Sequence, residues 1–163
     1  MNKNYHLLIV MGLLIFFSIG SPQQLGVGII IGSPTGFTGK ATFTQRSAFA
    51  VNIGWSLGDN PKLHITGDYQ FLFPTILRWT DDMTGEQKEI KNLLPYIGIG
   101  GRFKFKEDEA QNETNLNLGL RLGGGIEYII SRFGIFLEIY PVVNIYPGTD
   151  FDLEGGLGAR IYF

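Results

Sequence analysis

From Leu25 onward, apolar residues recur at every second position in a series of short segments. Segment 25–32 is typical: its odd positions are Leu, Val, Ile and Ile, and glycine fills three of its four even positions. A period of two is typical of a β-strand with one apolar face, and no run after Gly20 has the helical period. We therefore predict eight strands, at residues 25–32, 37–44, 48–56, 63–71, 97–106, 116–123, 135–140 and 151–163.

Turn-forming residues separate most of these segments, as at 33–36, 58–61 and 147–150. One connection, residues 74–92, is much longer and is partly apolar at both ends, so the flanking strands could extend into it. Either this connection is an exception among otherwise short turns, or the strand count near it is off.

The alternation alone does not say which face meets water. The non-apolar face is rich in Gly, Ala, Thr and Ser with single charges spaced along it, which suits a narrow lumen better than a solvated surface. Aromatic residues near the strand ends fit the two interfacial girdles of a membrane barrel: Phe43, Trp55, Phe71, Phe105, Phe133, Tyr146, Phe151 and Phe163. The pattern predicts an all-β protein, an eight-stranded antiparallel up-and-down transmembrane β-barrel.

The first 20 residues have the layout of a secretory signal. Lys3 precedes an apolar run of 13 residues at 7–19, and small residues follow at Ser18 and Gly20. A membrane-spanning helix needs roughly 20 apolar residues, so an anchor is the weaker alternative. We expect a signal peptide at residues 1–20 and a barrel domain at 21–163.

Composition narrows the remaining classes. The net charge of −2 gives no basic footprint for nucleic acid, and the absence of cysteine excludes a disulfide scaffold, a thiolate metal site and a cysteine nucleophile. Charged residues make up 17% of the chain, against about 25% in average proteins. No sequence feature calls for a cofactor or a metal.

The alternation turns several charged residues into the predicted lumen. Charges in a narrow tube are costly unless they are paired, so equal numbers of cations and carboxylates predict a network that closes the barrel. We expect Arg121 and Glu138, on neighbouring strands, to be one pair, and Lys104, Lys106, Asp152 and His64 to lie nearer the rims or to stay neutral. The predicted lumen charge network is Lys40, Asp68, Arg102, Arg121, Glu127, Glu138, Glu154 and Arg160.

The last four residues, Arg-Ile-Tyr-Phe, resemble the C-terminal signal of bacterial outer-membrane β-barrels. The resemblance implies that Ile161, Tyr162 and Phe163 form an assembly signal, which the barrel-assembly machinery reads. The chain is similar in size to OmpA- and OmpX-type barrels, and segments 25–36, 96–102 and 136–163 resemble a family of uncharacterised small outer-membrane barrel proteins. This resemblance covers nearly all of residues 21–163 and implies an integral, multi-pass protein of the bacterial outer membrane, but it implies no settled activity.

The predicted function is an outer-membrane barrel with a charge-plugged lumen and a structural or surface-interaction role, without enzymatic activity. Its partners would be outer-membrane lipid, the barrel-assembly machinery and, for surface contact, an extracellular or host ligand; nucleic acid is not among them. One alternative is a small pore. Another is a lipid-modifying outer-membrane enzyme, for which His64 with Asp68 and Ser56 is the candidate set. A soluble lipocalin-like binder would need a more densely charged outer face.

Overall fold

The computed structural model describes residues 23–55, 63–80, 83, 85–108 and 113–163, and within these ranges the secondary structure is all β. The predicted signal peptide at 1–20 and the predicted turn at 58–61 lie outside the described residues. In the described part of the chain, no helix is long and apolar enough to cross a membrane. The strands are β1 (Gln24–Gly32), β2 (Thr35–Thr44), β3 (Ser47–Trp55), β4 (Leu63–Leu72), β5 (Thr75–Thr80), β6 (Gln87–Asp108), β7 (Glu113–Ile130), β8 (Phe133–Tyr146) and β9 (Asp150–Tyr162).

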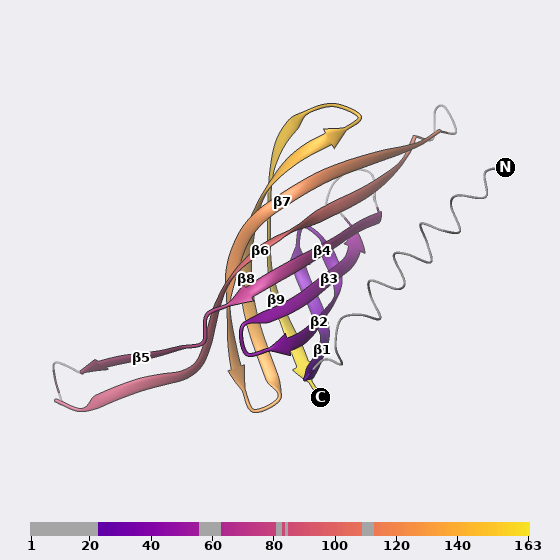
Figure 1. Cartoon of the computed structure of the whole chain (residues 1–163). Coiled ribbons are helices and arrows are strands. Elements are labelled where there is room, and N and C mark those ends of the chain that lie inside the picture. Colours follow the sequence, from indigo (N-terminus) through magenta and orange to yellow (C-terminus); the bar gives the residue numbers. More distant parts are fainter. Residues whose placement is uncertain (1–22, 56–62, 81–82, 84, 109–112) are drawn as a thin grey trace.

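Eight of these strands form a closed antiparallel barrel (Figure 1). Each strand pairs with the next along the chain, except that β4 pairs with β6 across the position of β5. Pairing of β1 with β9 closes the ring, from Gly26 opposite Tyr162 to Gly32 opposite Gly156. The predicted eight-stranded up-and-down barrel is therefore confirmed as the fold.

The long 74–92 connection contains a ninth strand, which the sequence did not predict. β5 pairs with the first residues of β6, from Thr80 opposite Gln87 to Thr75 opposite Leu93. We call β5 together with residues 87–92 the arm. In Figure 1 the arm leaves the barrel at the end where β1 begins and β9 ends, and it projects sideways. We call this end the terminal end and the opposite one the far end.

Two further differences from the prediction concern strand length. β6 has 22 residues and β7 has 18, so both are longer than the predicted segments 97–106 and 116–123. Their pairing continues from Leu93 opposite Tyr128 to Asp108 opposite Glu113. Glu107, Asp108, Glu113 and Thr114 had the composition of a loop, but their backbones pair as part of the two strands.

Side chains alternate between the interior and the exterior along every barrel strand. In β8, Ile135, Leu137 and Ile139 are exposed, whereas Phe136 and Glu138 are buried. The exterior is apolar on the other strands as well, and most of the buried polar residues are charged or carry amides. A protein that folds in water has the opposite arrangement.

Six of the eight aromatic residues predicted for the girdles are exposed at the two ends of the barrel, whereas Phe43 and Phe105 are only partly exposed. Phe71, Phe133 and Phe163 lie at the terminal end, where β4 ends, β8 begins and β9 ends. Trp55, Tyr146 and Phe151 lie at the far end. The exterior thus consists of an aliphatic band between two sets of aromatic side chains.

Glycines on the inner face make room for rings that cross the interior. An added Cβ at Gly158 would overlap the ring of Phe136, and one at Gly98 would overlap the Tyr140 side chain. The interior is therefore filled by a few large side chains opposite positions that have none, which is how an eight-stranded barrel packs its narrow lumen.

Candidate functional site in the barrel interior

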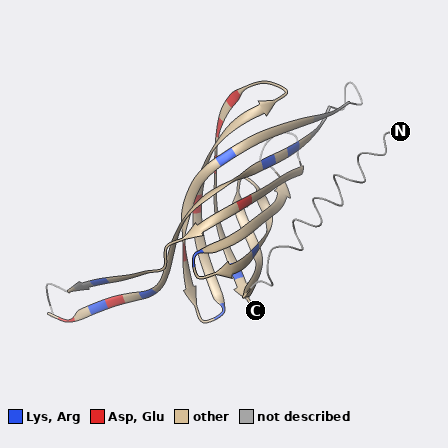
Figure 2. Cartoon of the chain, in the orientation of Figure 1, with Lys and Arg blue, Asp and Glu red and all other residues tan. Residues whose placement is uncertain are grey.

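The structure buries all eight residues of the predicted lumen network, each with an exposed fraction of 3% or less. They come from strands all round the barrel. Lys40 is on β2, Asp68 on β4, Arg102 on β6, Arg121 and Glu127 on β7, Glu138 on β8, and Glu154 and Arg160 on β9. Figure 2 shows acidic and basic residues on the strands of the barrel wall.

Glu127 is the centre of a cluster on the side of the lumen nearer the terminal end. Its carboxylate accepts a hydrogen bond from Lys40 Nζ at 2.7 Å and one from the Tyr162 hydroxyl at 2.5 Å. Arg160 Nη1 lies 3.3 Å from the same carboxylate, and its Nη2 donates to Thr38 Oγ1 at 2.8 Å. One carboxylate thus pairs with two cations, contributed by β2 and β9.

Arg121 is the centre of a second cluster. Its Nε lies 2.9 Å from Asp68 Oδ1, and its Nη1 lies 3.1 Å from Glu154 Oε2. The predicted partner Glu138 is the most distant of the three carboxylates, at 3.8 Å from Nη2. The predicted pair of Arg121 and Glu138 is therefore present, but Asp68 on β4 and Glu154 on β9 lie closer to the guanidinium.

Glu154 connects Arg121 to a third cluster nearer the far end. Arg102 Nη1 donates to Glu154 at 2.7 Å and to Asp152 at 2.8 Å. Lys104 Nζ lies 2.8 Å from Glu154. The sequence interpretation had placed Lys104 and Asp152 at the rim, outside the network. Asp152 is partly exposed at 43% of its side chain, but both residues take part in the ion pairs.

Aromatic rings and amides complete the contacts of the buried charges. Arg121 stacks over Tyr140 at 4.0 Å and Arg160 over Phe136 at 3.7 Å, the distances being from the guanidinium carbon to the ring centroid. The attraction between a cation and the face of an aromatic ring is strongest where water is excluded. Arg102 also donates to the side-chain oxygens of Asn117 and Asn144. The Asn144 and ring contacts had no signal in the sequence, because they depend on which strands face each other across the lumen.

The Tyr96 side chain connects the Glu127 cluster to the Arg121 cluster. It donates to Glu138 at 2.9 Å, and Lys40 Nζ lies 5.0 Å from the centre of the Tyr96 ring. Contacts therefore run from Tyr162 near the terminal end, through Lys40, Tyr96, Glu138 and Arg121, to the Arg102 cluster. Counted with Lys104 and Asp152, the interior ion pairs of the described residues join five cations and five carboxylates, whose formal charges are equal and opposite.

The structure describes two of the three candidate enzyme residues, His64 and Asp68, and both belong to the charge network. His64 is fully buried and its Nε2 lies 3.3 Å from Glu154 Oε1, within the charge network. Ser56 lies outside the described residues. Among the described residues, no group of three His, Cys, Asp or Glu side chains is placed to hold a metal ion.

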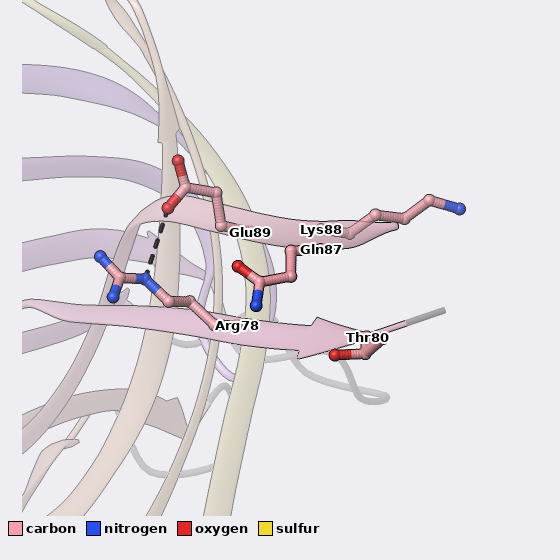
Figure 3. A pocket seen from close by; sticks show the side chains of 5 residues that line it. All are labelled: Arg78, Thr80, Gln87, Lys88 and Glu89. Atoms are coloured by element: carbon pink, nitrogen blue, oxygen red, sulfur yellow. Dashed lines mark ion pairs between the residues drawn. The ribbon is translucent and has the colours of Figure 1, made fainter. Parts of the chain in front are cut away.

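The described residues also line hollows, one at the end of this network and one on the arm. One, of about 600 Å³, opens at the terminal end, and Lys40, Leu72, Leu94 and Tyr162 are among its lining residues. The other, of about 550 Å³, lies on the arm beside Arg78, Thr80, Gln87, Lys88 and Glu89 (Figure 3). On the arm, a hydrogen bond from Lys91 lowers the pKa of the exposed Glu89 carboxyl from its ordinary value.

Comparison with known proteins gives one informative result, from the solved structures. No known protein family matches the chain, and no curated protein matches it. The fold is similar to the crystal structure of the N-terminal β-barrel domain of Pseudomonas aeruginosa OprF, with a TM-score of 0.63. The likeness covers 87% of this chain and 98% of that domain at 13% sequence identity. The likeness is one of fold.

Proposed function

We propose that this protein is an integral outer-membrane β-barrel whose lumen is closed by ion pairs, with a structural or surface-interaction role and no enzymatic activity. The observation that carries the proposal is the reversed distribution of side chains, with charges inside and aliphatic residues outside. In water that exterior would be an aggregating surface, whereas in a bilayer it is the surface that acyl chains require.

Barrel closure supports the same proposal. An open sheet edge in hydrocarbon would leave backbone groups without hydrogen bonds, and the pairing of β1 with β9 removes that edge. Backbone hydrogen bonds between Leu25 and Phe163 extend this seam. The proposal includes outer-membrane lipid and the barrel-assembly machinery as partners, with Ile161, Tyr162 and Phe163 as the residues that the machinery would read. The likeness of the protein's fold to the OprF barrel domain favours the outer membrane over other locations.

The closed lumen is argued from the pairing of its charges. A wide water-filled pore leaves charged side chains hydrated, whereas here each of Arg102, Arg121 and Arg160 lies within 3.3 Å of at least one carboxylate oxygen. Opposite charges that meet across the lumen also occupy the space through which an ion would pass. The balance of charge argues against the selective small pore, which would favour an excess of one sign.

Cysteine accessibility tests the facing of the strands, and the chain has no native cysteine to interfere. In the refolded barrel in lipid vesicles, we expect Leu120→Cys, Leu137→Cys and Leu118→Cys to react only with lipid-soluble thiol reagents. Asn117→Cys, whose native side chain accepts a hydrogen bond from Arg102, should resist those reagents and react slowly with water-soluble ones. Ready labelling of Leu120→Cys and Leu137→Cys by water-soluble reagents would instead mean a soluble barrel.

A further inference from the structure

The arm has two different faces, which the strand register defines. Leu77 on β5 is opposite Ile90 on β6, and these two share one face, on which the register also places Lys88 nearer the tip of the arm. Arg78 is opposite Glu89, and these two share the other face. On that second face, Glu89 lies 3.5 Å from Arg78 and 2.6 Å from Lys91. Figure 3 shows the Arg78 and Glu89 side chains pointing toward one another.

The apolar face of the arm continues the exterior of the barrel. On β4 the outward side chains are at odd positions, such as Tyr69 and Phe71, and this series runs through Phe73 to Leu77. On β6 the outward positions in the barrel are odd as well, so an unbroken strand would turn Ile90 inward. A register shift opposite Thr75–Leu77 corrects this, and Asn92 in that stretch has a φ of 64°. The shift returns Ile90 to the outer face, opposite Leu77.

This face is exposed beyond the aromatic residues of the terminal end. Phe73 and Leu77 have exposed fractions of 50% and 47%. When a barrel wall bends outward, its exterior face turns toward the plane of the membrane, and Figure 1 shows the arm turned sideways from the barrel. The Arg78–Glu89–Lys91 face is then directed away from the bilayer.

We propose that the arm lies along the bilayer surface at the terminal end, with the Leu77 and Ile90 face in contact with lipid and the Arg78–Glu89–Lys91 face in water. The proposal rests on the membrane location argued above, because the lipid contact of the arm is continuous with that of the barrel. Amphipathic segments bind at the boundary of headgroups and acyl chains by the same division of faces. The arm thus widens the contact of the protein with one leaflet beyond the barrel wall.

Spin labels on single cysteines can test this in dimyristoylphosphatidylcholine vesicles. Adjacent residues give the matched pair: Leu77→Cys on the apolar face and Arg78→Cys on the polar face. The measurement is the collision rate of each label with oxygen, which concentrates in lipid, and with a water-soluble nickel chelate. We expect the nickel-to-oxygen ratio at Leu77→Cys to be severalfold lower than at Arg78→Cys, and Ile90→Cys to behave like Leu77→Cys.

Further labels separate failure of the arm proposal from failure of the membrane proposal. A label at Leu137→Cys, on the barrel exterior, reports lipid contact of the barrel alone. If Leu137→Cys is protected from nickel but Leu77→Cys and Ile90→Cys are as accessible as Arg78→Cys, the arm proposal is wrong and the barrel proposal stands. If Leu137→Cys is also accessible to nickel, both fail. Dipolar broadening between Thr80→Cys labels would show the β5 strands of two chains pairing in water, which also overturns the arm proposal.

Discussion

At the scale of single residues, the position of each charge could be predicted but its partners could not. Alternation with period two was enough to turn Lys40, Arg121 and Glu127 inward, because a strand allows only two directions. For Arg121, the predicted partner Glu138 lies 3.8 Å away, but the closer carboxylate of Asp68 was not predicted. The contact with Asp68 depends on the stagger of the strands round the barrel, which no local pattern encodes.

Arg121 gives the clearest test of the network. Removing its side chain in Arg121→Ala takes from Asp68 the cation that lies 2.9 Å away, whereas Glu154 keeps its pairs with Arg102 and Lys104. Loss of one member of a buried pair costs about 3–5 kcal/mol, because the remaining charge stays buried and unpaired. We expect the urea midpoint of unfolding of the refolded barrel to fall accordingly.

The matched control is Arg78→Ala on the arm, whose pair with Glu89 is exposed. An exposed pair contributes about 0–1 kcal/mol, so this variant should unfold close to the wild-type midpoint. Equal midpoints for Arg121→Ala and the wild type would mean that the interior is hydrated enough to screen its charges.

At the scale of strands, the sequence predicted eight elements and missed the arm for a physical reason. Within residues 74–92, the register shift near Asn92 breaks the alternation, so that Ile90 and Leu93 share a face although they are three positions apart. The polar residues around Gln87 belong to a hairpin that leaves the barrel wall. Apolar outward positions therefore do not alternate with these polar residues as they do in the barrel strands. Because of both features, a prediction that relies on a period of two does not detect this strand.

Strand packing inside the barrel depends on glycines that face rings. In Gly158→Ala the new methyl would overlap the Phe136 ring, which is itself held under Arg160. Overpacking of this kind costs about 1–3 kcal/mol, so the unfolding midpoint should fall. Gly39→Ala is the control, because the nearest atom to its new methyl would be 3.9 Å away. Similar falls in the unfolding midpoint of the two variants would contradict the packing argument. They would mean instead that replacing a strand glycine by alanine is destabilising in general.

At the scale of the whole molecule, the barrel is a closed wall with an apolar exterior round a charged interior. The contacts of this interior form a continuous series from Tyr162 to Arg102. Removing one charged side chain from the series leaves an opposite charge buried without that partner. Fold likeness to the OprF barrel domain fits this architecture but carries no activity with it. The role we propose therefore belongs to the outer surfaces, namely the barrel exterior, the arm and the far-end connections.

Planar-bilayer recording of the refolded wild-type barrel tests the central claim most directly. Insertion would be verified on the same preparation by heat-modifiable migration on a gel, so that silence cannot be ascribed to a lack of inserted protein. With the lumen closed by paired charges and rings, we expect no stable conductance steps. Stable ohmic steps from the wild-type protein would contradict the account, because they would require an open, water-filled path through the positions that Arg121, Tyr140 and Glu127 occupy in the structure.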